Sequence, residues 1–202
     1  KTVYLTGKGT TTDYVDRYLF RDNGLSEEDV TLEYKSEAAE VAAILKEKTG
    51  AVGLLPQPFV TVALTQNPDL GIVLDLTEEW DKVQGTDGSR LVTGVTIVRK
   101  DFLAENTEAV DAFLLEHKAS TEAVYEDPDA AAELIVQAGI IEKPEIAKKA
   151  LPYCNITYID GQEMKNALSG YLSVLAEQDP SSVGGSLPGD DFYYEASAGP
   201  QS

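Results

Sequence analysis

Short strand-like runs alternate with amphipathic helical segments through the first half of the chain, and this alternation constrains the fold more than any other feature. The predicted strands cover residues 2–6, residues 30–34 and the stretch "AVGLLP". Between them, residues 11–23 and a segment opened by Ser36 carry apolar residues at helical spacing and end at Gly24 and Gly50. Strands separated by helices of this length imply right-handed crossovers and a mainly parallel sheet, so we expect an α/β fold.

The pattern continues with one more short helix and two further strands. "PFVTVALTQNP" predicts a helix between Pro58 and Pro68. "GIVLDL" (71–76) and "LVTGVTIVRK" (91–100) are rich in β-branched and aliphatic residues and predict a fourth and a fifth strand. The polar, glycine-rich residues 81–90 between them predict a loop.

From Asp101 onward the apolar spacing is helical. Asp127 before Pro128 is typical of a helix start, with the cap followed by proline at the first helical position. Asp160 with Glu163 three residues later predicts a capping box for another helix. We therefore expect a sheet flanked by helices, followed by a mainly helical second half.

Composition excludes several classes of function. A formal net charge of −19 argues against binding to nucleic acid or to anionic lipid, which both require a basic surface. The single cysteine, Cys154, excludes an internal disulfide and a cysteine-based zinc cluster. The sequence opens with Lys1 directly before a strand, with neither an initiator methionine nor a signal peptide, so we expect that an upstream segment has been removed.

The glycine–threonine loop after the first strand is a candidate ligand site. Its candidate binding residues are Gly9, Thr10, Thr11 and Thr12. Free amides and the dipole at a helix N-terminus favour an anion or a polar ligand atom. Against a phosphate, the glycine spacing matches neither common phosphate-binding motif, Asp13 can use the free amides itself, and only Lys8 adds positive charge. The alternative is that Thr10 or Thr11 simply caps the helix.

A second loop, after the third strand, is expected at the same edge of the sheet, where ligands of open parallel sheets bind. There Gln57 and Pro58 precede Phe59, so that an amide and an aromatic face could meet a ligand. The alternative is a proline-stiffened turn with Phe59 in the core. Trp80 is a further candidate, because aromatic rings sandwich planar ligands, although a tryptophan covering an edge of the core fits the sequence equally well.

The chain offers little for catalysis. His117, the only histidine, lies within a predicted helix, and nothing in the sequence brings it to Cys154. With Met164 the only other sulfur residue, we expect no metal site, no cofactor and no enzymatic activity.

The chain resembles the solute-binding proteins of ABC importers, specifically the nitrate/sulfonate/taurine and thiamine-pyrimidine-precursor group. The resemblance covers nearly the whole chain in the family's order. It is carried by "GKGTTTDYVDRYLFRDNGL", "EAAEVAAILKEKTGAVGLLPQPFVTVAL", "LDLTEEWDKV", "VTIVRKDFLAENTEAVDAFLLEH", "YCNITYIDGQEM" and "LPGDDFYY".

The resemblance implies a type II periplasmic-binding-protein fold, in which two α/β lobes clamp the ligand. Residues 1–97 would form the second lobe, and residues 98–202 would be a helical segment packing on the first lobe. The family's preceding segment, which completes the first lobe and supplies half of the ligand contacts, has no counterpart here. Self-association through the surface that it normally covers is therefore an expectation.

The resemblance implies capture of a small polar or anionic solute and its delivery to an ABC permease. It also implies an extracytoplasmic location, in the periplasm or lipid-anchored at the cell surface. The alternative is the ligand-sensing effector domain of a transcription regulator, which has the same fold. A structural or interaction domain without a ligand is the third possibility.

Overall fold

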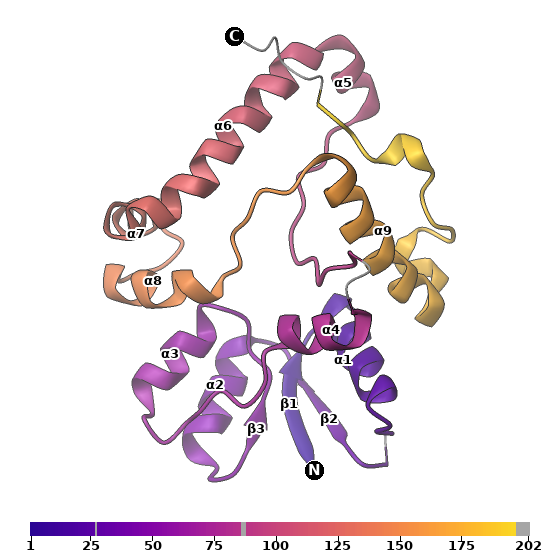
Figure 1. Ribbon diagram of the computed structural model, residues 1–202. Coiled ribbons are helices and arrows are strands. Elements are labelled where there is room, and N and C mark those ends of the chain that lie inside the picture. The colour runs from indigo at the N-terminus through magenta and orange to yellow at the C-terminus, as the bar shows by residue number, and fades with distance from the viewer. Residues whose placement is uncertain (27, 86–87, 197–202) are drawn as a thin grey trace. The chain divides into compact units, whose positions relative to one another are not determined.

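The computed structural model describes residues 1–26, 28–85 and 88–196, which form a mixed α/β protein with a small parallel sheet and many helices (Figure 1). The strands are β1 (Thr2–Thr6), β2 (Thr31–Lys35) and β3 (Val52–Gly53). The α-helices are α1 (Thr11–Asp22), α2 (Ala38–Glu47), α3 (Phe59–Gln66), α4 (Leu76–Gln84), α5 (Lys100–Glu105), α6 (Thr107–Glu126), α7 (Pro128–Gln137), α8 (Pro144–Ala150) and α9 (Gly161–Gln178). Short 3-10 turns cover Leu151–Tyr153, Pro180–Val183 and Asp190–Phe192.

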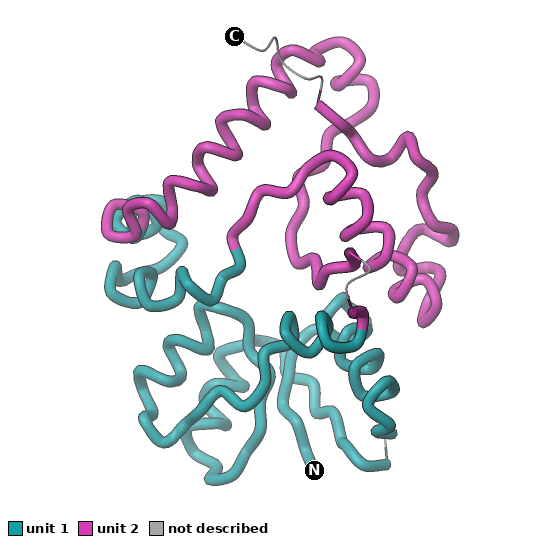
Figure 2. Tube along the Cα trace, in the orientation of Figure 1, with its two compact units in different colours: residues 1–83, 132–155 teal, residues 84–131, 156–202 magenta. Residues whose placement is uncertain are grey.

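These elements belong to two compact units that are interleaved in the sequence (Figure 2). The first, unit 1, contains residues 1–83 and 132–155, and the second, unit 2, contains residues 84–131 and 156–202. The sequence-based division is instead a single cut after residue 97.

The sheet lies in unit 1 and has the strand order β2-β1-β3, with both pairs parallel. The central strand β1 is paired along its whole length with β2, from Thr2 opposite Thr31 to Thr6 opposite Lys35. The pairing with β3 is shorter. The predicted parallel α/β arrangement of the first half is therefore present.

Helices α1 and α2 cover opposite faces of this sheet. Tyr4 pairs with Gly53, and a Cβ added to Gly53 would lie 2.9 Å from a methyl carbon of Val41, so this face contacts α2. Leu5 pairs with Tyr34, whose hydroxyl reaches α1, so the other face contacts α1. Both Tyr4 and Leu5 are buried, which is the pattern of a central strand covered on both faces.

Two predicted strands are absent. Residues 71–74 and 91–98 have no regular secondary structure, so the prediction of a fourth and a fifth strand is wrong for the described chain. A strand needs a partner backbone as well as β-branched residues, and the sheet ends at β2 and β3. The predicted loop at 81–90 is also wrong in part, because α4 continues to Gln84; residues 86–87 lie outside the described residues.

Of the two helix starts predicted in the second half, one is capped as predicted and the other is not. The Asp127 carboxylate accepts a hydrogen bond from the Ala130 amide at 3.0 Å and caps α7, as predicted. Asp160 occupies the cap position of α9, but its side chain makes no capping bond, so the predicted capping box does not form. No helix among the described residues has the length and apolar character needed to cross a membrane.

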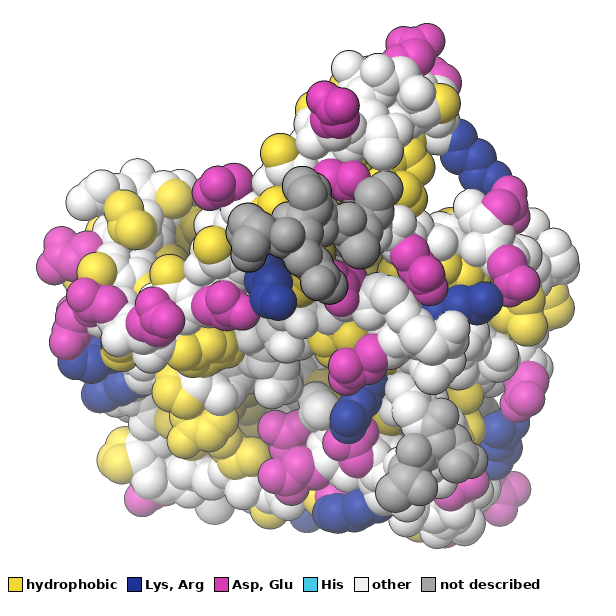
Figure 3. Space-filling view, turned by 45° about the horizontal axis from the view of Figure 1, so that its top comes forward, with side chains coloured by type: hydrophobic (Ala, Val, Ile, Leu, Met, Phe, Trp, Pro, Cys, Tyr) yellow, Lys and Arg dark blue, Asp and Glu magenta, His cyan; other side chains and the backbone are white. Residues whose placement is uncertain are grey.

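The surface reflects the acidic composition. Aspartate and glutamate number 35 against 16 lysines and arginines. Figure 3 shows acidic side chains spread over much of the face that it presents, with hydrophobic side chains exposed between them. This distribution agrees with acidic residues acting mainly as solvated surface.

Candidate functional site

The two candidate loops lie at the same edge of the sheet. The first, residues 7–10, follows β1 and leads into α1, and the second, residues 54–58, follows β3 and leads into α3. Because β1 and β3 are adjacent and parallel, both loops leave the carboxyl edge of the sheet, where open α/β sheets bind their ligands. The order of elements alone predicts this placement correctly.

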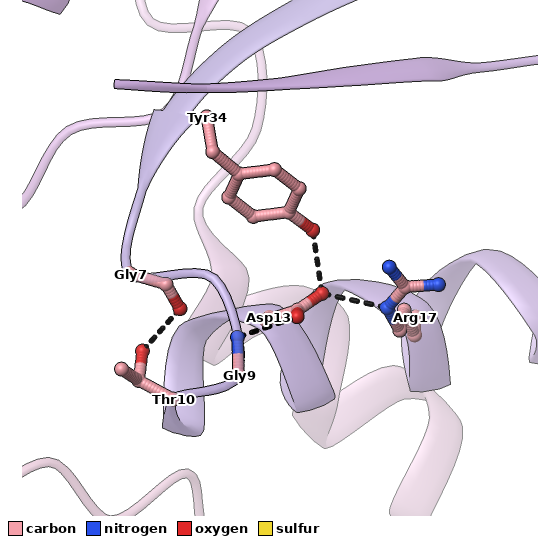
Figure 4. Close-up of polar contacts among 6 residues, drawn as sticks. All are labelled: Gly7, Gly9, Thr10, Asp13, Arg17 and Tyr34. Carbon is pink, nitrogen blue, oxygen red and sulfur yellow. Dashed lines mark hydrogen bonds and ion pairs between the residues drawn. The ribbon is translucent and has the colours of Figure 1, made fainter. Parts of the chain in front are cut away.

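The first loop is closed by the protein's own Asp13 (Figure 4). The Gly9 amide donates to one Asp13 carboxylate oxygen at 2.8 Å. The other oxygen accepts from the Tyr34 hydroxyl and from Nε of Arg17, each at 2.6 Å. We call these four residues the Asp13 cluster. The carboxylate of Asp13 thus occupies the N-terminus of α1, the end of a helix that favours an anion.

Electrostatics within the Asp13 cluster favour the ionised carboxylate. Burial alone would raise the pKa of Asp13, but the hydrogen bonds from Tyr34, Gly9 and Arg17 outweigh it and hold this pKa below its ordinary value. Burial and the bond to Asp13 raise the pKa of Tyr34 to about 12. Tyr34 therefore remains a hydrogen-bond donor throughout the physiological range.

A second carboxylate, Asp16, lies one turn further along α1 and is only 5% exposed. Burial, followed by repulsion from the Asp13 charge, raises its pKa to about 7. Two neighbouring acids on one helix thus have pKa values shifted in opposite directions, because hydrogen-bond donors offset the burial of Asp13. Sequence periodicity gives no signal for Asp16, since an acidic residue at this position also fits a solvated helix face.

The threonines do not cap α1 as the alternative interpretation requires. Thr10 occupies the cap position, but its side chain makes no capping bond. Its hydroxyl instead donates to the Gly7 carbonyl at 2.6 Å and tightens the loop. Thr11 is exposed and Thr12 is half-buried, and both lie in the first turn of α1, directly after the loop.

The second loop is also organised by internal bonds. The Gln57 side-chain oxygen accepts from the Thr61 hydroxyl at 2.8 Å and more weakly from the Thr61 amide at 3.4 Å, across the first turn of α3. The bond between Gln57 and Pro58 is cis. Phe59 is 38% exposed, so the interpretation that places it in the core is wrong, and its ring can contact a ligand.

Trp80 of α4 is fully buried. Its ring packs against Tyr18 of α1, with 5.2 Å between the ring centroids. Trp80 therefore belongs to the core of the described structure. This agrees with the second of the two interpretations of Trp80, in which it covers the core and does not contact a ligand. In this structure its ring offers no surface to a solute.

A cavity of about 170 Å³ lies away from the candidate loops. It is lined by Arg17, Phe20, Arg21, Leu25, Ser26, Val30 and Leu32. Leu32 of β2 and Val30, directly before that strand, lie toward the amino edge of the sheet, and Arg17 of the Asp13 cluster lies on the other side of the cavity's lining, on α1. None of the predicted site residues lines it.

Cys154 and His117 have different surroundings. The Cys154 thiol donates to the Ala150 carbonyl with 3.3 Å between sulfur and oxygen, and burial raises its pKa, which disfavours the reactive thiolate. The His117 ring stacks on Phe113 and meets the edge of Tyr158. Among the residues that the structure describes, no group of histidine, cysteine and acidic side chains could hold a metal ion.

Comparison with known proteins gives one informative match. No family model matches the sequence, and no curated protein does. The chain is similar to a crystal structure of an ABC transporter from Parabacteroides distasonis, with 26% sequence identity and a TM-score of 0.72. The match covers 97% of this chain but only 66% of that chain, so this chain spans slightly less than two thirds of its length. This chain therefore has an ABC-transporter-related fold.

Proposed function

We propose that the chain belongs to the solute-binding component of an ABC importer, which captures a small polar solute outside the cytoplasm and delivers it to a membrane permease. The observation that carries this proposal is the match to the Parabacteroides distasonis structure over nearly the whole chain. The two loops that leave the carboxyl edge of the sheet support it, because this edge is the usual ligand-binding place of open α/β sheets. The type II periplasmic-binding-protein fold is part of the proposal.

The Asp13 cluster narrows the chemistry of the solute. A bare anion at the start of α1 would meet a buried, ionised carboxylate that already holds the Gly9 amide. A solute that also carries a cationic or hydrogen-bond-donating group would be favoured there. Among the solutes that the resemblance implies, taurine and pyrimidine precursors satisfy this condition better than nitrate or a simple sulfonate.

Thr12 and Phe59 are the side chains with which the loops would hold the solute. Thr12 is half-buried beside the first loop, and Phe59 exposes its ring beside the second. A hydroxyl can satisfy a polar group of the solute, and an aromatic face suits a pyrimidine ring. Gly9, Thr10, Thr11, Gln57 and Pro58 would shape the loops around it.

Isothermal titration of the intact protein with taurine, ethanesulfonate, nitrate and an aminopyrimidine tests the proposal. Ethanesulfonate is the matched control for taurine, because it lacks only the ammonium group. We expect measurable binding for taurine or the aminopyrimidine and weaker binding for the two plain anions. Absence of binding by all four would refute this assignment of the solute class, and a gel shift of DNA by the intact protein would support the regulator instead.

The Thr12→Val variant tests the site itself. Loss of one hydrogen bond to a bound solute is expected to weaken binding by about tenfold. Thr31→Val is the matched control, because Thr31 is exposed at the amino edge of the sheet, away from the loops. Equal affinity of both variants and the unaltered protein would remove Thr12 from the site.

A further inference from the structure

The cavity of about 170 Å³ in unit 1 shares no residue with the two candidate loops. It lies where the end of α1 and the turn after it face the start of β2 (Figure 1). Its lining combines apolar walls with polar side chains: Phe20, Leu25, Val30 and Leu32, with Arg17, Arg21 and Ser26. Apolar walls with a few polar groups are the usual lining of a small-molecule site.

Backbone hydrogen bonds hold the turn that forms one wall of the cavity. The Leu25 amide donates to the Phe20 carbonyl at 2.8 Å, and the Gly24 amide donates to the Arg21 carbonyl at 3.1 Å. These are the two bonds of a Schellman motif, in which Gly24 takes the required positive φ of 71°. Phe20 and Leu25 are therefore held in place as walls before any ligand arrives.

Two polar side chains of the lining already bind other groups of the protein. Nε of Arg17 donates to Asp13, and the ionised carboxylate offsets the charge of this arginine. The Ser26 hydroxyl donates to a carboxylate oxygen of Asp29 at 2.7 Å. A ligand would have to compete with these bonds for either side chain.

Arg21 has no such competitor. Its guanidinium lies over the ring of Tyr18, 5.5 Å from the ring centroid. Within residues 1–26, 28–85 and 88–196 this guanidinium makes no hydrogen bond and no ion pair. Attraction between a cation and the face of a ring does not need a hydrogen bond. The N–H donors of Arg21 can therefore bind the two oxygens of a carboxylate side by side.

The volume of the cavity sets the size of the apolar part of a ligand. A dry protein cavity of about 150 Å³ lined by leucine, isoleucine and phenylalanine is known to hold benzene, so a cavity of about 170 Å³ accepts one six-membered ring. Phe20 adds an aromatic wall that suits such a ring. We propose that this cavity binds a small monocarboxylate with an apolar body the size of a benzene ring, and that Arg21 binds its carboxylate. The proposal does not depend on the proposed solute.

Isothermal titration of the intact protein with benzoate, benzyl alcohol and acetate tests the class of ligand. Benzyl alcohol keeps the ring without the charge, and acetate keeps the carboxylate without the ring. We expect benzoate to bind with a Kd of about 1 mM or lower, and each control compound to bind at least about tenfold more weakly. Absence of benzoate binding at about 10 mM, or equally tight binding of benzyl alcohol, would refute the proposal.

The Arg21→Gln variant tests the place of binding. Arg21 is exposed near the end of α1, so we expect the variant to keep the fold, and a thermal melt checks this. We expect benzoate binding to weaken by about tenfold or more. Arg99→Gln is the matched control, because it removes the same charge from a side chain that is 80% exposed in unit 2, and it should leave the affinity unchanged.

Three results with these variants would overturn the proposal. Equal benzoate affinity of Arg21→Gln and the unaltered protein would remove Arg21 from the site. Equal weakening by Arg99→Gln would show an effect of net charge and not of a cavity. Weakening by Thr12→Val but not by Arg21→Gln would place benzoate at the candidate loops. Failure of taurine and the aminopyrimidine to bind would refute the proposed solute class alone, because a different ligand and a different variant test the cavity.

Discussion

The sheet β2-β1-β3 and the two stretches at residues 71–74 and 91–98, which were predicted as strands but form none, have similar strand-forming residues but opposite surroundings. In β1, Tyr4 and Leu5 are buried, and Tyr4 is paired with both β2 and β3, whereas Val73 and Ile97 are exposed and have an unpaired backbone in the described structure. The difference shows that a stretch of β-branched and aliphatic residues forms a strand only where a neighbouring strand is available to pair with its backbone. In unit 1 the neighbouring strands arrive through α1 and α2, which carry the chain from one strand to the next.

Leu5→Ala tests the paired region and should have the largest effect. Leu5 is fully buried at the centre of β1, so its truncation leaves a cavity between the sheet and α1. We expect a loss of about 2–5 kcal/mol in the free energy of unfolding, measured by urea denaturation. Leu115→Ala is the matched control, because Leu115 of α6 is 70% exposed, and it should change stability by less than about 0.5 kcal/mol.

The second prediction concerns Asp16, on the helix that covers this region. Its pKa is raised from 3.8 to about 7 in the folded chain, so the folded state binds a proton that the unfolded state releases. Stability should therefore fall as the pH rises from about 4 to about 7, by an amount on the order of 3 kcal/mol. Asp13 does not act in this window, because its pKa is lowered and its contribution to stability is lost only at more acidic pH.

Thermal unfolding of Asp16→Asn across this pH range measures the effect. The neutral amide has no proton to release, so we expect the slope between about pH 4 and about pH 7 to disappear. Asp22→Asn, an exposed substitution on the same helix, should keep the slope. An unchanged slope in Asp16→Asn would mean that another group carries the pH dependence.

Asp13→Asn tests the closed loop after β1. The substitution weakens the bonds to Tyr34 and Arg17 and leaves the Gly9 amide with a poorer acceptor. We expect a loss of about 1–3 kcal/mol at neutral pH, measured by urea denaturation. Because the Asp13 charge raises the pKa of Asp16, the Asp16 transition should also move to lower pH.

Tyr34→Phe provides the control for this prediction. It removes one donor to Asp13 and leaves the carboxylate in place, so its cost should be smaller than that of Asp13→Asn. The double variant should cost less than the sum of the two single variants, since both remove the same bond. Strict additivity would show that the bond between Tyr34 and Asp13 contributes nothing to stability.

Sequence periodicity predicts the regular part of unit 1 well and its candidate site poorly. The first two strands and the helix between them follow from local pattern to within one residue, and the shared sheet edge follows from the parallel strands that alternation with helices implies. The Asp13 cluster needs Tyr34 from the next strand, a contact that only the folded sheet creates. The predicted strands at 71–76 and 91–100 fail because strand propensity does not supply a partner.

Val73→Thr completes the comparison and should have the smallest effect. Val73 is 83% exposed and unpaired in the described structure, so replacing a methyl group with a hydroxyl should change the free energy of unfolding by less than about 0.5 kcal/mol. The same substitution at Val41, which is fully buried against the sheet, should cost about 1–3 kcal/mol because it buries a hydroxyl. Urea denaturation of both variants gives the contrast. If both substitutions lowered the free energy of unfolding equally, residues 71–74 would have to be packed in solution. Strand-forming residues would then be ordered there without a paired strand.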